Sequence, residues 1–170
     1  DKPSNRKVIS TKIIDDTQRE EVVASVKNHL KNKMQVYWVC TRVEDTLDVG
    51  VQSVKVFSDN IKKSFPKCKV SLLHGKMSSE EKIKIINNFN TGNIDILVAT
   101  SVIEVGVDCP NANCLVIENS ELFGLAQLHQ LRGRVGRGEK QGFCYLVYSS
   151  KTKAESIEKL MYLENHHSGF

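Results

Sequence analysis

Residues 95–118 read DILVATSVIEVGVDCPNANCLVIE, which is two short apolar runs separated by a loop. The runs, DILVAT (95–100) and NCLVIE (113–118), are apolar on both faces and contain several β-branched residues. That composition is typical of strands buried in a parallel sheet. Three further runs have the same character: VYWVC (36–40), KVSLL (69–73) and FCYLVY (143–148). We therefore predict a mostly parallel sheet of about five to seven strands.

Amphipathic stretches alternate with these runs and predict helices. They cover residues 17–32, 53–65, 78–92, 124–138 and 151–165. Asp16 or Thr17 can cap the first helix, and Ser78 with Glu81 forms a capping box for the third, which stops at Gly92. Strands that alternate with helices predict an α/β domain whose sheet is flanked by helices. The first dozen residues are expected to be an extended entry segment.

Apolar side chains recur at helical spacing along four of these helices and should face the core. They are Val22, Val23, Val26, Leu30, Val54, Phe57, Ile61, Phe65, Ile83, Ile86, Phe89, Leu125, Leu128, Leu131 and Val135. A chain of 170 residues is long enough to bury such a core. We therefore interpret residues 1–170 as one domain.

The composition indicates a globular protein with a mild preference for anionic partners. Hydrophobic residues make up 40% and charged residues 26% of the chain, which is ordinary for such a protein. The net charge of +4 suits an anionic partner without proving one, because many enzymes are equally basic.

The five cysteines do not form a metal site or a disulfide framework that the sequence can identify. Their number is odd and no CxxC pair occurs. Most of them lie in apolar runs, so we interpret them as small buried thiols in a reducing compartment. No signal peptide and no apolar run of membrane-spanning length is visible. The expectation is a cytoplasmic protein with no metal ligands and no membrane partner.

The loops that follow the predicted strands carry hydroxyls, glycines and single cations. Thr41 and Arg42 follow the run VYWVC (36–40), and His74-Gly75-Lys76-Met77 follows KVSLL (69–73). Thr100 and Ser101 lie at the end of DILVAT (95–100). Ligands of parallel sheets bind beyond the carboxyl ends of strands, and hydroxyl and backbone N–H groups there can donate to phosphate oxygens. Each such residue taken alone is more often just a helix cap.

Residues 127–138, QLHQLRGRVGRG, concentrate three arginines between glycines. If residues 124–138 form one helix, Gln130, Arg134 and Arg137 fall together on one face. Planar arginine forks suit bidentate phosphate recognition, and Gly133 and Gly136 leave room for a ligand or another backbone. The alternatives are a solvated basic face or a disordered RG-type segment, although periodic leucines disfavour disorder.

These motifs resemble those of superfamily 2 helicases. QLRGRVGR (130–137) matches the QxxGRxxR pattern of motif VI, TSVIEVGVD (100–108) looks like motif V, and VYWVCTRVED (36–45) resembles motif IV. The longer run from Ile103 to Glu139 resembles the RecG family of branched-DNA helicases. Transcription-repair coupling factors share GLAQLHQLRGRVGR, but the run VIEVGVD favours RecG.

The resemblance implies the second RecA-like motor domain of a larger ATP-dependent DNA helicase. It implies the RecA-like P-loop NTPase fold, ATP and Mg²⁺ as cofactors, and branched DNA (stalled forks and Holliday junctions, in recombination and repair) as partner. Neither a Walker A sequence nor a DExx-type magnesium motif is present in the chain. The resemblance implies that a first motor domain and a DNA-wedge domain of the same protein are needed for helicase activity. The isolated chain is therefore predicted to be inactive.

The resemblance also assigns roles to residues. Arg134 and Arg137 would stabilise charge on the γ-phosphate, with Gln130 positioning the phosphate or the water. Asp108 would hold the ribose, and Gly106 would allow close backbone approach. Contacts to the nucleic-acid backbone would come from Thr41, His74, Gly75, Thr100 and Ser101.

Other interpretations stay open from the sequence alone. His74 and His129 fit structural roles better than catalytic ones. The chain as a whole could be a stand-alone nucleic-acid-binding module, a protein-interaction domain that reuses a motor fold, or part of an RNA-unwinding enzyme.

Overall fold

The structure is a computed structural model that describes residues 9–40, 47–100, 109, 111–135 and 140–166, without the side chains of 47–53. Its centre is a six-stranded sheet in the order β1-β6-β5-β2-β4-β3, and every pair in it is parallel. The strands are β1 (Ile9–Asp15), β2 (Val36–Cys40), β3 (Val70–Leu73), β4 (Ile96–Thr100), β5 (Cys114–Ile117) and β6 (Gly142–Tyr148). The predicted parallel sheet is confirmed.

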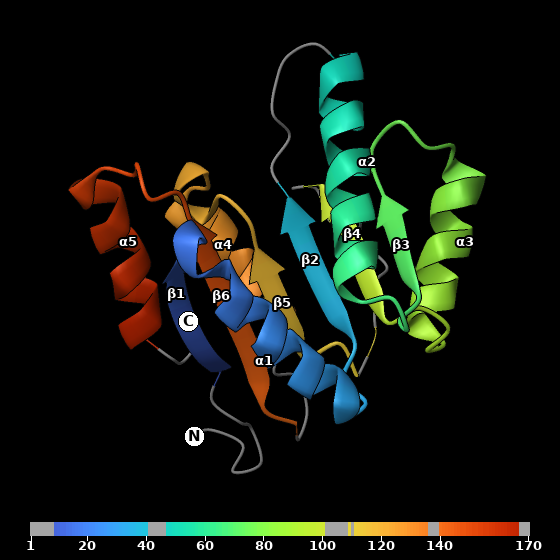
Figure 1. The fold of residues 1–170 in the computed structure, drawn as a ribbon, viewed down its shortest axis with the longest axis horizontal. Helices are drawn as coiled ribbons and strands as arrows, with labels where there is room; N and C mark the ends of the chain where they lie inside the picture. The colour runs from blue at the N-terminus through green and yellow to red at the C-terminus, as the bar shows by residue number, and fades with distance from the viewer. Residues whose placement is uncertain (1–8, 41–46, 101–108, 110, 136–139, 167–170) are drawn as a thin grey trace.

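Helices cover both faces of this sheet, which gives three layers (Figure 1). The helices are α1 (Arg19–Lys31), α2 (Leu47–Ser64), α3 (Ser79–Asn90), α4 (Leu125–Arg132) and α5 (Ala154–Asn165), with short 3₁₀ turns η1 (Asp16–Gln18) and η2 (Ser120–Leu122). Side chains of α1 and α2 pack on one face of the sheet, and those of α3, α4 and α5 pack on the other. Helices α1, α2, α3 and α4 therefore run back from the carboxyl edge of the sheet to its amino edge, and α5 follows the last strand, β6.

Alternation along the central strands explains the two-sided core. Leu115 and Ile117 of β5 enter the cluster under α3, α4 and α5, whereas Cys114 and Val116 enter the cluster under α1 and α2. All four side chains are fully buried, as expected of a parallel strand covered on both faces. Burial also raises the pKa of the Cys144 thiol on β6 to about 12, which fits an inert core cysteine.

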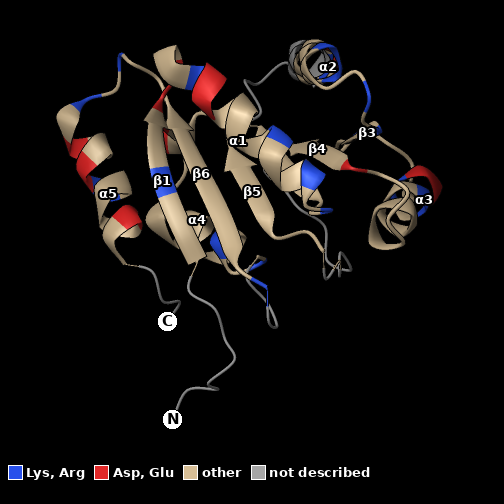
Figure 2. Ribbon diagram, turned by 60° about the horizontal axis from the view of Figure 1, so that its bottom comes forward, with Lys and Arg blue, Asp and Glu red and all other residues tan. Residues whose placement is uncertain are grey.

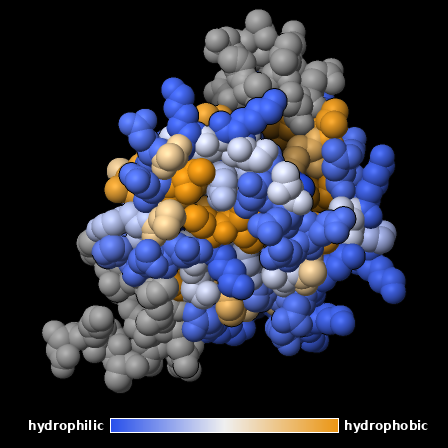
Figure 3. Space-filling view, turned by 60° about the vertical axis from the view of Figure 1, so that its left-hand side comes forward, coloured by the Kyte–Doolittle hydropathy of each residue, from blue (hydrophilic) through white to orange (hydrophobic). Residues whose placement is uncertain are grey.

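Strand β1 corrects the expectation for the first dozen residues. From Ile9 onward they are part of the sheet, because β1 pairs with β6 from Ile9↔Gly142 to Asp15↔Tyr148. Thr11 and Ile14 of this strand are buried, while Lys12 between them is exposed. Figure 3 brings this edge of the molecule forward and shows an apolar patch within a largely hydrophilic surface.

The helix starts follow the predicted capping chemistry in one case and differ in another. Ser78 Oγ accepts from the Glu81 N–H at 3.1 Å and the Ser78 N–H donates to Glu81 Oε1 at 3.1 Å, so the capping box is confirmed. The expected cap at Asp16 or Thr17 is wrong. Asp15 caps the η1 turn through the Thr17 N–H at 2.9 Å, and α1 begins only at Arg19.

Two further helix predictions needed correction. Helix α2 begins at Leu47 instead of residue 53, six residues earlier than the apolar pattern indicated. Ile83 of α3 was predicted to face the core, but its side chain is 59% exposed, whereas Ile86 and Phe89 are buried and Ile85 packs against the same cluster. The helix does stop before Gly92, which has a positive φ of 89°.

Candidate nucleotide and nucleic-acid contacts at two edges of the sheet

Helix α4 ends earlier than its sequence pattern predicted. It stops at Arg132, and the chain continues in tight turns in which the N–H groups of Arg134 and Val135 donate to the carbonyls of Leu131 and Arg132 at 3.1 and 3.2 Å. Leu125, expected in the core, is 41% exposed, whereas Val135 is buried beyond the helix end. The single helix predicted for 124–138 is therefore wrong, and Gly133 is the C-cap of a helix that ends at Arg132.

Gln130, in the last turn of α4, and Arg134, in the turn after it, both lie at this end of the helix. The Gln130 side chain is exposed and that of Arg134 is half-buried, so both are accessible from outside the domain. Gly133, between them, has an ordinary helical conformation, and a Cβ there would meet only helix carbonyls at 3.5 Å. Packing among the described residues therefore gives no reason for glycine at 133, which fits close approach by another group. Arg137 lies outside the described residues.

The end of α4 lies at the amino edge of the sheet. Helix α4 follows β5, which ends at the carboxyl edge, and precedes β6, which begins at the amino edge. The arginine-bearing segment therefore faces the edge opposite to the strand-following loops.

Arg132, to which the sequence reasoning gave no role, anchors this segment. Its side chain is 2% exposed, and its Nη1 donates to Leu163 O at 2.8 Å and to Thr11 Oγ1 at 3.1 Å. Burial lowers the pKa of its guanidinium from the usual value. Arg132 thus joins the end of α4 to β1 and α5, two elements far away in the sequence. No local pattern distinguishes it from Arg134, because only these distant contacts bury it.

A buried amide holds the neighbouring segment that follows motif V. Gln35 Nε2 donates to the carbonyls of Phe89 and Ile94 at 2.7 and 2.8 Å, and Cys109 Sγ lies 3.0 Å from Gln35 Oε1. The Gln35 N–H also donates to Asn111 O at 2.8 Å. Cys109 and Asn111 are therefore held at the amino edge, just before β5. Gly106 and Asp108, the predicted nucleotide contacts, lie outside the described residues.

Asn111 also contacts the segment that follows motif VI. Lys140 Nζ donates to Asn111 Oδ1 at 2.6 Å. Lys140 follows motif VI in the chain and Asn111 follows motif V, so the segments behind the two motifs meet at this edge. Cys109, Asn111 and Lys140 therefore lie together at the amino edge, the edge at which α4 ends.

The predicted nucleic-acid contacts belong to the carboxyl edge. His74 and Gly75 follow β3, and Thr100 is the last residue of β4. A Cβ at Gly75 would meet nothing within 4 Å, so the space around this glycine is open to a ligand. The Thr100 side chain is buried, which does not favour a direct contact through its hydroxyl. Thr41 and Ser101 lie outside the described residues.

His74 has a defined hydrogen-bonding state. Its Nδ1 accepts from the Lys76 N–H at 3.2 Å, and burial, with the Lys55 charge, lowers the pKa of the imidazole. A neutral ring that accepts at Nδ1 carries its proton on Nε2. His74 can therefore stabilise the turn through Nδ1 and donate from Nε2 to a phosphate oxygen. A structural role and a binding role for His74 are thus compatible. His129, on α4, is half-buried, and its pKa is lowered by burial and by the Arg132 charge.

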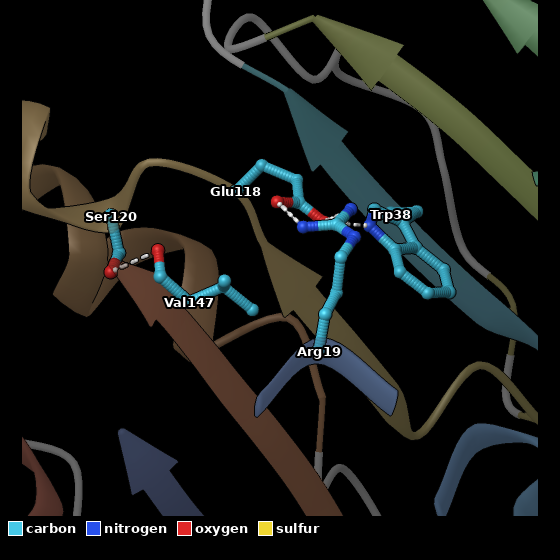
Figure 4. A network of polar contacts seen from close by, with 5 residues as sticks. All are labelled: Arg19, Trp38, Glu118, Ser120 and Val147. Carbon is cyan, nitrogen blue, oxygen red and sulfur yellow. Dashed lines mark hydrogen bonds and ion pairs between the residues drawn. The ribbon is translucent and has the colours of Figure 1, made fainter. Parts of the chain in front are cut away.

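A buried carboxylate organises the carboxyl edge on the face of α1 and α2. Glu118, directly after β5, accepts from Arg19 Nη1 at 2.7 Å and from Trp38 Nε1 at 2.8 Å, and it pairs with Arg19 Nη2 as well (Figure 4). Ser120 Oγ donates nearby to Val147 O at 2.9 Å (Figure 4). Together these bonds tie the first turn of α1 to β2 and β5. They border a cleft of about 420 Å³ between α1 and α2.

The described side chains suit part of a nucleotide site only. Arg134 and Gln130 supply a fork of donors and an amide, which can contact phosphate oxygens but cannot enclose a nucleotide. Among the described residues, no group of three His, Cys, Asp or Glu side chains could hold a metal ion. Within those same residues, no helix is long and apolar enough to cross a membrane.

Comparison with known proteins defines the class first. Residues 17–139 match the helicase conserved C-terminal domain, so the chain belongs to that family. Among its relatives are helicases of one kind. It is 41% identical over 169 residues to the ATP-dependent DNA helicase RecG of Haemophilus influenzae and 40% identical to RecG of Escherichia coli K12. Each alignment covers 99% of this chain and 24% of the relative.

Solved structures agree with this assignment. A structure of RecG bound to a three-way DNA junction superposes with a TM-score of 0.84 at 38% identity, over 100% of this chain and 22% of that one. Domain 2 of the DEAD-box helicase Mss116p, bound to an RNA duplex, has a TM-score of 0.71 at 20% identity, over 94% of this chain and 61% of that one. The second likeness shows the fold alone. The predicted RecA-like helicase fold and the resemblance to RecG are confirmed.

Proposed function

We propose that this chain is the second motor domain of an ATP-dependent DNA helicase that acts on branched DNA in recombination and repair, in the bacterial cytoplasm. The observation that carries the proposal is the amino-edge arrangement of Gln130 and Arg134, anchored by Arg132, in a chain 38–43% identical to RecG helicases. The chain spans about a quarter of the length of those relatives, so the remaining functions belong to other parts of such a protein.

ATP and Mg²⁺ would be held mainly by a first motor domain, which would supply the phosphate cradle and the metal site for phosphoryl transfer. This chain contributes the opposite wall. Arg134 lies in the turn that follows α4, and Arg137 comes three residues later. Guanidinium groups at this edge would stabilise negative charge on the γ-phosphate once the two domains close. Asp108 and Gly106, next to the anchored Cys109, would contact the nucleotide from the same edge.

DNA would contact the opposite edge. Open space at Gly75 and the Nε2 donor of His74 both suit a phosphate backbone that passes the carboxyl ends of β3 and β4. Thr41, Thr100 and Ser101 are proposed for the same track. A sheet buried on both faces separates the two ligands, so a shift at the nucleotide edge would move the whole domain along the DNA as one body.

Strand separation tests this function. The intact protein that carries the chain should unwind a three-way DNA junction when ATP is present, and its ATP hydrolysis should rise with junction DNA. The isolated 170-residue chain should hydrolyse no ATP and should bind DNA weakly, with affinity that falls as salt rises. An intact protein that binds junction DNA without DNA-stimulated hydrolysis would instead be a nucleic-acid-binding module, and the motor assignment would be wrong.

A further inference from the structure

One surface of the domain is strongly basic and is formed by residues to which no role is assigned above. It is formed by two stretches, residues 27–33 and 62–69, that contain seven lysines and no Asp or Glu. We call it the basic surface, and its members are Lys27, Lys31, Lys33, Lys62, Lys63, Lys67 and Lys69. All seven side chains are exposed.

The two stretches adjoin in space. Helices α1 and α2 both run from the carboxyl edge to the amino edge on the same face of the sheet, so their last turns lie at that edge together. Lys27 Nζ of α1 lies 6.0 Å from the ring centroid of Phe65, the residue directly after α2. Figure 2 shows the blue segments at the end of α1, on α2 and in the connection to β3 on one side of the domain.

These lysines lack carboxylate partners. Within the described part of the chain, none of the seven forms an ion pair, and the ion pair of this face is that between Arg19 and Glu118. Asp95, beside Lys69, is engaged with the Lys69 backbone N–H at 2.8 Å. Among the residues that the structure describes, no carboxylate therefore neutralises the positive charge of the basic surface.

The seven lysines of the basic surface account for the net positive charge of the whole chain. Without its seven lysines, the other 17 Lys and Arg residues are outnumbered by 20 Asp and Glu. Lysines in the last turns of α1 and α2 stabilise helix ends by the helix dipole, worth about 0.3–1 kcal/mol each. Lys33, Lys67 and Lys69 lie beyond those helices, so helix stabilisation does not explain them.

We propose that the basic surface binds the phosphate backbone of a duplex DNA arm, as a second DNA contact distinct from the carboxyl-edge loops. Two adjoining helix ends span about 20 Å, a length over which duplex DNA presents roughly twelve phosphate charges. Lysines without arginine forks suit this partner because they act as point charges that bind phosphates without reading sequence. The proposal rests on the proposed function, since it assumes that the protein acts on branched DNA.

Salt-dependent DNA binding by the intact protein tests it. The variant is Lys31→Gln with Lys63→Gln and Lys67→Gln. The matched control is Lys84→Gln with Lys151→Gln and Lys153→Gln, which removes the same charge from exposed lysines elsewhere. Binding is measured by fluorescence anisotropy over roughly 50–200 mM salt, with forked DNA that has one long arm and with the same fork after that arm is shortened.

The basic-surface variant should bind the long-armed fork at least about tenfold more weakly and should lower the salt slope by about three, because each phosphate contact contributes about 0.9 to it. The control should retain the slope, and the shortened fork should make the variant and the unmodified protein nearly alike. Equal slopes for variant and control would overturn the proposal. So would a variant that binds both forks normally but hydrolyses ATP slowly, since the surface would then contact another part of the protein.

The proposed function can fail separately. An unmodified protein without DNA-stimulated ATP hydrolysis would contradict the motor assignment, while its salt slope on the long-armed fork would still report on the basic surface.

Discussion

The bond between Glu118 and Trp38 should be one of the strongest single polar interactions in this domain. Trp38 is fully buried, and its Nε1–H donates to the Glu118 carboxylate at 2.8 Å. A hydrogen bond to a charged group contributes about 1.5–3 kcal/mol, and a buried donor left without a partner costs about 1–3 kcal/mol. Arg19 adds less, because its side chain is 36% exposed and solvent screens the ion pair.

Glu118→Leu should therefore lower the free energy of unfolding by about 3 kcal/mol, most of it from the unpaired indole N–H. Trp38→Phe removes that donor but also leaves a cavity, so the single variant mixes two effects. A double-mutant cycle with both changes cancels the cavity and isolates the bond. We expect a coupling free energy of about 2 kcal/mol from urea denaturation of the four proteins. A coupling below about 0.5 kcal/mol would refute the reasoning, because the carboxylate would then not stabilise the indole.

Three further substitutions test the anchors of the fold. Arg132→Met should lower the free energy of unfolding by about 2 kcal/mol, because it leaves Leu163 O buried without its charged donor; an unchanged urea midpoint would show that Arg132 is not an anchor. Burial lowers the pKa of His29, so the unfolded chain binds the proton more readily and stability should fall as pH drops below about 6.5. His29→Phe should flatten that dependence between pH 8 and 5, and a persistent slope would assign it to other groups. Ser78→Ala should cost about 1 kcal/mol by thermal unfolding, whereas Ser78→Asp, which caps equally well, should cost little.

The sheet and the capping box could be predicted because their signals are local. A strand such as β5 is apolar on both faces whatever surrounds it, and Ser78 and Glu81 form their two bonds within one turn. Strand β1 carries a weaker signal, since Ser10 and Lys12 interrupt its apolar residues. Its place in the sheet depends on pairing with β6, more than a hundred residues later.

The end of α4 shows why the candidate site was harder to predict. Val135 continues the helical spacing of Leu128 and Leu131, and it is buried as that spacing suggests, but a turn places it there. Arg132 and Arg134 look alike in the sequence. One is buried by Thr11 and Leu163 and the other is accessible, and only the tertiary contacts separate the anchor from the candidate contact.

The proposed function requires this domain to contribute arginines to ATP hydrolysis. The direct measurement is steady-state hydrolysis on forked DNA by the intact protein and its Arg137→Ala variant, with nucleotide and DNA affinities measured beside it. Loss of an arginine finger lowers turnover by about 10³-fold or more, so we expect that loss with nucleotide affinity much less affected, and a similar loss for Arg134→Ala. Near-normal turnover in Arg137→Ala together with lost DNA affinity would make the residue a nucleic-acid contact and contradict the account.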